Sequence, residues 1–306
     1  MSVWKRNILV VLAVLVAIGG GAYYWFVVES HMPSDAAFEL DINEVRRLAD
    51  EMPGNKPAKI QVEQIGAFSF PSTAVVAGDG WKQTAMPVFS YQLVFPDGKT
   101  GIIDTALSKE QGGENLGGFD ADAYARMSKA LGAARFVIIT HEHMDHMGGI
   151  SAYPDFAQIA PVVALSQEQI DHPERSGVAA LSAENSKLLT PVVYDKYKAI
   201  APGVVLIKSP GHSPGSQMVY VRKADGREVL FLGDVAWHFR NIEVLRERAR
   251  LVTQFFLYED RKAVFGQLKA LSELDVAEPN IAIVPGHDGM VMASLLSEGV
   301  LSKGFE

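Results

Sequence analysis

Three histidines and an aspartate lie close together at His141, His143, Asp145 and His146, in the segment T-H-E-H-M-D-H-M-G-G. Imidazole nitrogens and carboxylate oxygens are the donors that Zn²⁺ and similar divalent metals prefer. The cluster directly follows residues 136–139, an apolar run that is typical of a buried strand. So many polar groups at one strand end are costly unless a ligand holds them together. The spacing therefore predicts a metal site.

Three more candidate ligands follow apolar runs further along the chain. His212 lies in S-P-G-H-S-P-G, Asp234 follows F-L-G, and His287 lies in V-P-G-H-D. Glycine allows the backbone to approach closely and turn such side chains inward. A lone histidine at a strand end is more often structural, but two metals could use all seven residues. The pattern thus favours a site for two ions.

These motifs resemble the metallo-β-lactamase superfamily of metallohydrolases. The resemblance lies in H-x-H-x-D-H at His141–His146, G-H-S-P-G at His212, G-D at Asp234 and P-G-H-D at His287, in the family's order. It covers roughly residues 60–300 and implies an α/β (α+β) fold, an αββα sandwich with both metals at one edge of two sheets.

The resemblance also implies a role for each residue. His141, His143 and His212 would bind the first metal, and Asp145, His146 and His287 the second. Asp234 would bridge the two ions. Asp104, after G-I-I, matches an acid that orients ligand imidazoles; the simpler interpretation is a turn aspartate that caps a strand.

Two divalent ions, expected to be Zn²⁺, would lower the pKa of a shared water from about 15.7 towards about 7 and so supply hydroxide. Asp145 could guide the proton to the leaving group, which makes it the expected catalytic residue. The chain has no cysteine, so histidines and carboxylates must hold any metal, and a thiolate nucleophile is excluded. The expected reaction is hydrolysis.

The segments P-V-F-S-Y-Q-L at 87–93 and I-I-D-T at 102–105 resemble the N-acyl homoserine lactonase branch. This favours opening of a cyclic ester, a lactone such as an acyl homoserine lactone. That branch often has a tyrosine three residues past the bridging aspartate, where this chain has Trp237. An indole donates a hydrogen bond but cannot exchange its proton as a phenol might. Trp237 and His238 are the expected pocket residues.

Four other functions stay open. A class B3-like β-lactamase suits an all-histidine ligand set and export, but those enzymes lack a bridging aspartate. A glyoxalase II-like thioesterase needs basic residues for glutathione, which are not evident, and a phosphodiesterase of this fold is a further alternative. A non-enzymatic scaffold would have a broken ligand set, whereas all seven positions are intact here.

Residues 8–28 form an uncharged apolar run of 21 residues after Lys5 and Arg6. At about 1.5 Å per residue this run spans a hydrocarbon core of about 30 Å. The two cations favour a cytoplasmic N-terminus, hence a single-pass protein of the inner (cytoplasmic) membrane with its catalytic domain on the periplasmic or extracellular side. Tyr23, Tyr24 and Trp25 would form an interfacial belt. The alternative is a signal peptide cleaved near G-G-A at 20–22 and release to the periplasm, which would expose an aromatic new terminus.

The expected organisation is an anchor or signal segment (1–30), a linker with a short helix that starts at Asp41 (31–59) and a catalytic domain (60–306). Strands are expected at 88–95, 101–103, 136–139, 162–165, 204–207, 217–221, 228–232 and 281–284, and helices at 120–131 and 261–274. Residues 166–197 are irregular, either a flap or a surface insertion.

The formal net charge of −8, without any run of basic residues, argues against nucleic acid as a partner. The expected partners are a small-molecule substrate and the membrane, and no pattern indicates an oligomeric state. His31 and His172 are expected at the surface, and Arg240 in solvent.

Overall fold

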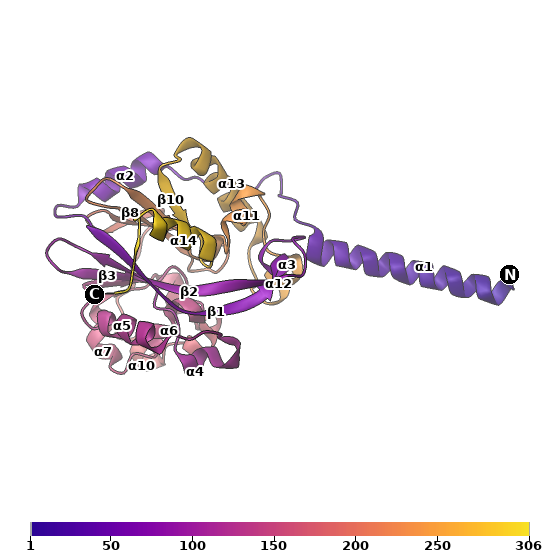
Figure 1. The fold of residues 1–306 in the computed structure, drawn as a ribbon, viewed down its shortest axis with the longest axis horizontal. Coiled ribbons are helices and arrows are strands. Elements are labelled where there is room, and N and C mark those ends of the chain that lie inside the picture. The colour runs from indigo at the N-terminus through magenta and orange to yellow at the C-terminus, as the bar shows by residue number, and fades with distance from the viewer. Residues whose placement is uncertain (1, 306) are drawn as a thin grey trace.

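The computed structural model describes residues 2–305. Two sheets pack against each other, helices cover both outer faces, and the long helix α1 (Val3–Tyr23) projects from one end of this body (Figure 1). The αββα sandwich expected from the sequence is confirmed.

Within residues 2–305 the first sheet has six strands, in the order β11-β1-β2-β3-β4-β5. Their bounds are β1 (Lys59–Pro71), β2 (Gln83–Val94), β3 (Thr100–Ile103), β4 (Phe136–Ile138), β5 (Val163–Ala164) and β11 (Ser302–Lys303). The second sheet of the described chain has five strands, in the order β10-β9-β8-β7-β6. They are β6 (Tyr197–Ala201), β7 (Val204–Lys208), β8 (Gln217–Arg222), β9 (Glu228–Phe231) and β10 (Ile281–Val284).

The helices of the body lie outside the two sheets or in the loops at their edges. They are α2 (Ile42–Glu51), α3 (Ser72–Val75), α4 (Lys109–Gly112), α5 (Ala121–Leu131), α6 (Met144–Ser151), α7 (Phe156–Ile159), α8 (Gln167–Asp171), α9 (Pro173–Ser176), α10 (Ala183–Ser186), α11 (Phe239–Glu243), α12 (Arg250–Phe255), α13 (Arg261–Ala277) and α14 (Gly289–Ser297).

Alternation along the strands produces the layers. Val204 and Leu206 of β7 pack between the sheets, whereas Val205 and Ile207 pack on the outer helices. Successive side chains of a strand point to opposite faces, so a strand that is apolar throughout must be covered on both sides. This explains why the run at 204–207 carries no polar residue.

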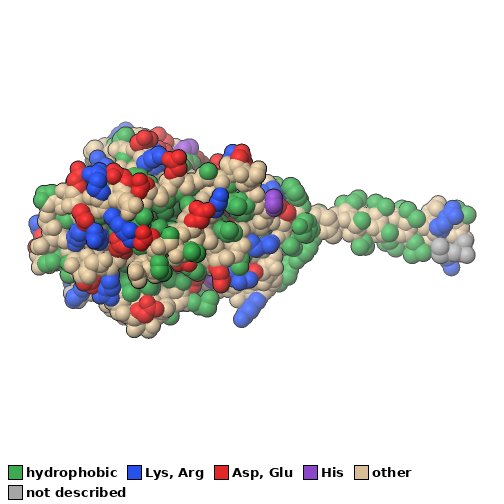
Figure 2. All heavy atoms as spheres, turned by 90° about the horizontal axis from the view of Figure 1, so that it is seen from above, with side chains coloured by type: hydrophobic (Ala, Val, Ile, Leu, Met, Phe, Trp, Pro, Cys, Tyr) green, Lys and Arg blue, Asp and Glu red, His purple; other side chains and the backbone are tan. Residues whose placement is uncertain are grey.

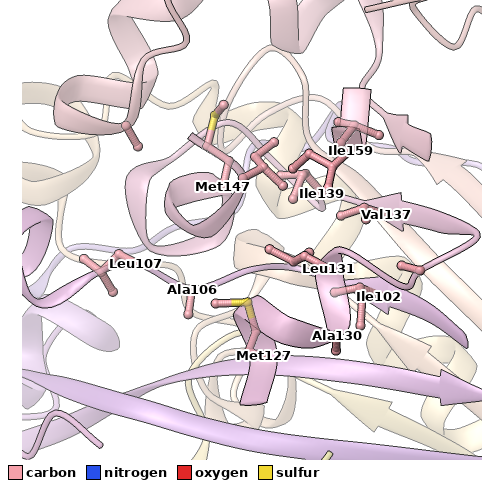
Figure 3. Packing of buried hydrophobic residues seen from close by; sticks show 14 of the residues in the cluster. Ile102, Ala106, Leu107, Met127, Ala130, Leu131, Val137, Ile139, Met147 and Ile159 are labelled. Atoms are coloured by element: carbon pink, nitrogen blue, oxygen red, sulfur yellow. The ribbon is translucent and has the colours of Figure 1, made fainter. Parts of the chain in front are cut away.

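The outer face of the first sheet packs against α5, α6 and α7. Ile102, Val137 and Ile139 contribute from the sheet side, and Met127 of α5 and Met147 of α6 from the helices (Figure 3). Each fully buried side chain of this size contributes about 1.5–3 kcal/mol. This layer holds β3 and β4, whose carboxyl ends carry predicted site residues, in a fixed position.

Most expected elements are present within a residue or two of their predicted ends, and Asp41 caps α2 as expected. Several elements were missed, including β6, α7, α11 and α12. Three others carry or adjoin residues of the predicted site. β1 is a long strand whose pairing with β2 shifts register between Gln64 and Gly66, so its side-chain alternation is broken. α6 begins inside the histidine cluster, where glycines hide its helical pattern, and α14 follows His287 directly.

Among residues 2–305, Val3–Val28 is the one helical segment whose length and hydropathy suit a membrane span. Its most apolar window has a mean hydropathy of 2.1 and is 0% buried, although a signal sequence near an N-terminus meets the same criteria. The helix ends in a π-helical turn, Tyr24–Val28, which rests on the body.

The π-helical turn is held by several contacts. Val27 is buried, the Phe26 ring lies 5.9 Å from the Phe255 ring, and the Arg250 guanidinium lies 4.0 Å from the Trp25 ring centroid. Arg250 also pairs with Glu29. The aromatic stretch that cleavage near residue 22 would expose is therefore partly docked, so its apolar character is a weaker argument against cleavage than the sequence suggests.

Candidate metal centre

The predicted ligands come from four strand ends that meet at one edge of the sandwich. β3 runs parallel to β4, and β9 runs parallel to β10, so the carboxyl ends of each pair lie side by side. The histidine cluster follows β4, His212 follows β7, Asp234 follows β9 and His287 follows β10. Side chains far apart in sequence therefore converge on one site.

All seven predicted ligands lie together. They form two neighbouring groups in which the donor atoms are within 4.8 Å of one another: His141, His143, His212 and Asp234, and Asp145, His146 and His287. Five of the seven side chains are buried, and His143 and Asp145 are partly exposed.

The carboxylate of Asp234 lies between the two groups. Its Oδ2 is 3.7 Å from Nε2 of His141 and 3.4 Å from Nε2 of His212. Its Oδ1 is 3.3 Å from Nε2 of His146 and 3.1 Å from Nε2 of His287. Each oxygen thus faces a different group, which is the arrangement that a bridging ligand requires.

Two glycines bring this carboxylate into place. A Cβ at position 286 would lie 2.3 Å from Oδ1 of Asp234, so only glycine fits there. Gly233 has a φ of +53°, which a residue with a side chain rarely adopts. The glycines of the G-D and P-G-H-D motifs therefore have a steric function at the site.

The donor set fits two divalent cations. Nδ1 of His143 is 2.9 Å from Nε2 of His212 and 3.1 Å from Nε2 of His141, so three ring nitrogens point at one position. Nε2 of His146 and Oδ1 of Asp234 are buried without a hydrogen-bond partner. Unpaired buried polar atoms are costly, and a cation in the group of His146 and His287 would satisfy both.

Burial and the neighbouring charges shift the pKa values of these histidines in the protein without metal. Burial holds the pKa of His141 and of His143 well below the usual value, which keeps both rings neutral. Burial also opposes a charged His146, but the carboxylates of Asp234 and Asp104 raise its pKa well above the usual range. A cation bound beside those carboxylates would take the place of the proton.

Asp104 does more than cap the end of β3, because it contacts the predicted ligand His146. Its Oδ2 is 2.8 Å from Nδ1 of His146, and it accepts hydrogen bonds from the backbone N–H and the hydroxyl of Thr140. Its φ of +56° is left-handed, a strained conformation for an aspartate. On the other side of the site, Nδ1 of His287 lies 2.9 Å from the carbonyl oxygen of Pro87. Such partners fix the tautomer and direct Nε2 towards the metal position.

Glu259 is a site residue that the sequence did not reveal. Its Oε1 is 2.5 Å from Nδ1 of His212 and 2.5 Å from Nη2 of Arg248, and its side chain is fully buried. Burial alone would raise the pKa of Glu259, but the charge of Arg248 holds this pKa below the usual value. Glu259 lies 47 residues after His212 in a segment without a motif, so no sequence pattern could have found it.

Trp237 lines the cavity and also supports the site. Its Nε1–H donates a 2.6 Å hydrogen bond to Oδ2 of Asp234. Its ring lies between Phe70, stacked at 6.0 Å, and the guanidinium of Arg248 at 4.9 Å. His238, also expected in the pocket, does not line the cavity. It is the N-cap residue before α11, and its backbone N–H donates to the side-chain oxygen of Asn241.

A cavity of about 780 Å³ opens onto the two groups. Its apolar lining consists of Phe68, Phe70, Met86, Trp237, Phe256 and Leu257. Glu114, Asn115 and Arg175 add polar and charged groups to the lining. The irregular segment 166–197 thus contributes to the cavity through Arg175, Ser176 and Gly177, while Arg240 pairs with Asp79 outside it.

Glu259→Gln should weaken metal binding about 10–100-fold at the group that contains His212, because a carboxylate behind a ligand imidazole raises its basicity. Titration of Zn²⁺ against a chelating dye measures this affinity. Glu174→Gln is the matched control, since that carboxylate contacts the exposed His172 at 2.9 Å. Wild-type affinity in a folded Glu259→Gln protein would show that Glu259 only neutralises Arg248.

A model of the metallo-β-lactamase superfamily matches residues 84–287. An N-acyl homoserine lactonase of Bacillus thuringiensis subsp. kurstaki is 29% identical over 114 residues, which are 35% of this chain and 41% of that protein. An N-acyl homoserine lactonase of a Bacillus species is 24% identical over 153 residues, 50% of this chain and 55% of that protein. The chain therefore spans only about half the length of the curated relatives it matches.

Solved structures show the same fold over more of the chain. A quorum-quenching N-acyl homoserine lactone lactonase superposes with a TM-score of 0.63 at 21% identity, over 79% of this chain and 97% of that one. An N-acyl homoserine lactone hydrolase with N-hexanoyl-L-homoserine at its catalytic metal center superposes with a TM-score of 0.62 at 19% identity. The match covers 78% of this chain and 96% of that one. The family match covers two thirds of the chain, including all seven clustered residues, and the chain belongs to the metallo-β-lactamase superfamily of metal-dependent hydrolases.

Proposed function

We propose that the protein is a dinuclear zinc hydrolase that opens a cyclic ester, a lactone such as an acyl homoserine lactone. The position of Asp234 carries the proposal, because its two oxygens face the two ligand groups separately. His141, His143 and His212 would hold the first ion, Asp145, His146 and His287 the second, and Asp234 both. Relatives and structural neighbours that are N-acyl homoserine lactonases support the choice of substrate.

When bound, two divalent ions would lower the pKa of a shared water to about 7 and polarise the ester carbonyl. The protein's own residues position the reaction. Asp145 lies at the cavity with a 17% exposed side chain, 3.5 Å from Nε2 of His287. From there its carboxylate can accept a proton and deliver it to the alkoxide that leaves the ring. The Trp237 N–H keeps Asp234 oriented throughout.

The mixed lining of the cavity suits an acylated lactone. The apolar side chains of Phe68, Met86 and Leu257 can pack along an acyl chain and exclude water from the ester. Arg175 and Asn115 also line the cavity and offer donors for the amide and ring oxygens; the Arg175 guanidinium is held beside Leu257 by a 2.6 Å hydrogen bond to its carbonyl oxygen. A volume of about 780 Å³ is in the usual range for small-molecule sites.

A turnover panel on the zinc-loaded full chain tests the substrate. It should contain acyl homoserine lactones of several chain lengths, a cephalosporin, a glutathione thioester and a phosphodiester. We expect kcat/KM for at least one lactone to exceed that of every other class. Faster turnover of the cephalosporin would instead support a β-lactamase.

Trp237→Phe should lower lactone kcat/KM about 10–100-fold, because it keeps an apolar ring but leaves Oδ2 of Asp234 without its donor. Steady-state kinetics and metal analysis measure the effect. The control is Trp81→Phe, which removes an exposed indole that donates to the Tyr23 hydroxyl outside the cavity. An equal loss in both variants would exclude a specific role for the Trp237 N–H.

We also propose that α1 anchors the protein in the cytoplasmic membrane with the catalytic domain on the periplasmic or extracellular side. Lys5 and Arg6 at the start of the helix support this orientation. A reporter enzyme fused after Glu29 should be active only outside the cytoplasm, and cytoplasmic activity would contradict the orientation.

A further inference from the structure

The exposed aromatic side chains of the body gather at one end. Outside the N-terminal helix, the exposed large aromatics of residues 2–305 are Phe70 (40%), Trp81 (61%), Phe255 (54%), Phe256 (71%) and Tyr258 (65%). With Leu251, which is 43% exposed on α12, they form a set called here the aromatic rim. Figure 2 shows hydrophobic side chains gathered where the helix leaves the body. A soluble surface rarely concentrates its apolar side chains in this way.

The aromatic rim is fixed to the base of the N-terminal helix. Trp81 stacks on Tyr23 at 6.4 Å, and Phe255 packs on Phe26 at 5.9 Å. Arg250, on the same helix as Phe255, holds both Trp25 and Glu29. The helix and the rim therefore share one surface, without a free linker between them.

Helix length places this surface at a definite depth. About 20 residues cross a hydrocarbon core of about 30 Å, so a span that starts after Arg6 ends near Phe26. Phe255, in contact with Phe26, then lies close to the boundary between acyl chains and headgroups. Tryptophan and tyrosine are enriched at that boundary because their rings are amphipathic.

The aromatic rim also forms the mouth of the cavity. Phe70 and Phe256 belong to the rim and line the cavity, and Leu257, beside Phe256, lines it as well. The wall of the cavity thus continues into the rim, and a long apolar group that leaves the cavity here meets the rim before it meets water.

We propose that the aromatic rim is a bilayer-contact surface that sets the mouth of the cavity at headgroup level, so that the enzyme draws long-chain acyl substrates from the membrane. The substrate part rests on the proposed lactonase function, and the bilayer contact does not. Each methylene raises partitioning into a bilayer about fourfold, so a dodecanoyl lactone would collect there far more than a butanoyl lactone.

The chain has no cysteine, so a single introduced cysteine can carry a fluorophore at one chosen position. Leu251→Cys probes the rim, and Val276→Cys, at an 80% exposed position at the end of α13, is the control. The full chain is placed in phosphatidylcholine nanodiscs, and quenching by nitroxide lipids is measured. We expect a blue shift and at least about twofold stronger quenching at position 251, because interfacial groups sink about 5–10 Å into the boundary.

Equal emission and quenching at the two positions would overturn the bilayer contact. So would a label at 251 that is shielded in detergent by a dimer, which would assign the rim to a second copy. Neither outcome depends on catalytic activity, so this test is independent of the proposed function.

A second test uses Leu251→Glu/Trp81→Glu, which places two charges on the rim and changes no residue that lines the cavity. In proteoliposomes the ratio of kcat/KM for dodecanoyl to butanoyl lactone should fall about tenfold, because interfacial binding scales with the apolar area that is buried and the double variant removes two apolar side chains. Val276→Glu should leave the ratio unchanged. An unchanged ratio in the double variant would overturn uptake from the membrane, whereas a complete absence of lactone turnover in the wild type would contradict the proposed function instead.

Discussion

Asp234→Asn is expected to lower kcat/KM about a thousandfold or more and to reduce the bound zinc from about two equivalents to about one. An amide has one oxygen and no charge, so it cannot serve both ligand groups. In the structure Oδ1 faces His146 and His287, whereas Oδ2 faces His141 and His212. A thousandfold loss corresponds to about 4 kcal/mol of transition-state stabilisation. Elemental analysis and steady-state kinetics measure the two effects.

The matched control for this substitution is Asp260→Asn. Asp260 caps α13 with an exposed side chain that accepts from the Ala263 N–H. Asparagine caps a helix about as well as aspartate does, so neither metal content nor activity should change. Two equivalents of zinc in Asp234→Asn would contradict the bridging role, while loss of metal in Asp260→Asn would point to a general effect on folding.

Much of this candidate site could be predicted because its residues lie in local motifs. His141, His143, Asp145 and His146 occupy one turn after β4, so the chain alone holds them together. His212, Asp234 and His287 are distant in sequence, but each follows a recognisable apolar strand and a glycine. The parallel neighbours β9 and β10 end at the same edge of their sheet, which brings Asp234 and His287 together. β7 runs in the same direction two strands away from β9, so His212 lies at that edge too.

The supporting residues could not be predicted in the same way. Glu259 reaches His212 only because α12 and the loop after it fold back over the site, a tertiary arrangement that no local pattern encodes. The same holds for the Pro87 carbonyl beside His287. Trp237 was identified, but the direction of its N–H depends on packing between Phe70 and Arg248.

The fold shows a similar division. Strands buried on both faces, such as β7, were found because apolar runs of this kind have few alternatives. β1 was missed because its bulge at Gly66 breaks the alternation. The N-terminal helix was found from composition, whereas its contacts with Phe255 and Arg250 were not, because they join segments more than 200 residues apart.

Removal of metal by a strong chelator should lower the melting temperature by about 15–30 °C. A ligand present at about 1,000 times its Kd stabilises the folded state by about 4 kcal/mol per site, hence about 8 kcal/mol for two sites. A domain of this size shifts by roughly 2–4 °C per kcal/mol. The structural reason is the buried donor set, in which Nε2 of His146 and Oδ1 of Asp234 have no hydrogen-bond partner. Differential scanning calorimetry with and without dipicolinate measures the shift.

Two comparisons separate this effect from damage by the chelator. Readdition of zinc should restore the melting temperature. In Asp234→Asn, the chelator should lower the melting temperature by only about half as much as in the wild type, since one group keeps its three histidines. If metal-free and zinc-loaded proteins melted within about 2 °C of each other, the ions would contribute little to the folded state. The convergent histidines would then have to be stable without a cation, which the unpaired buried atoms at their centre argue against.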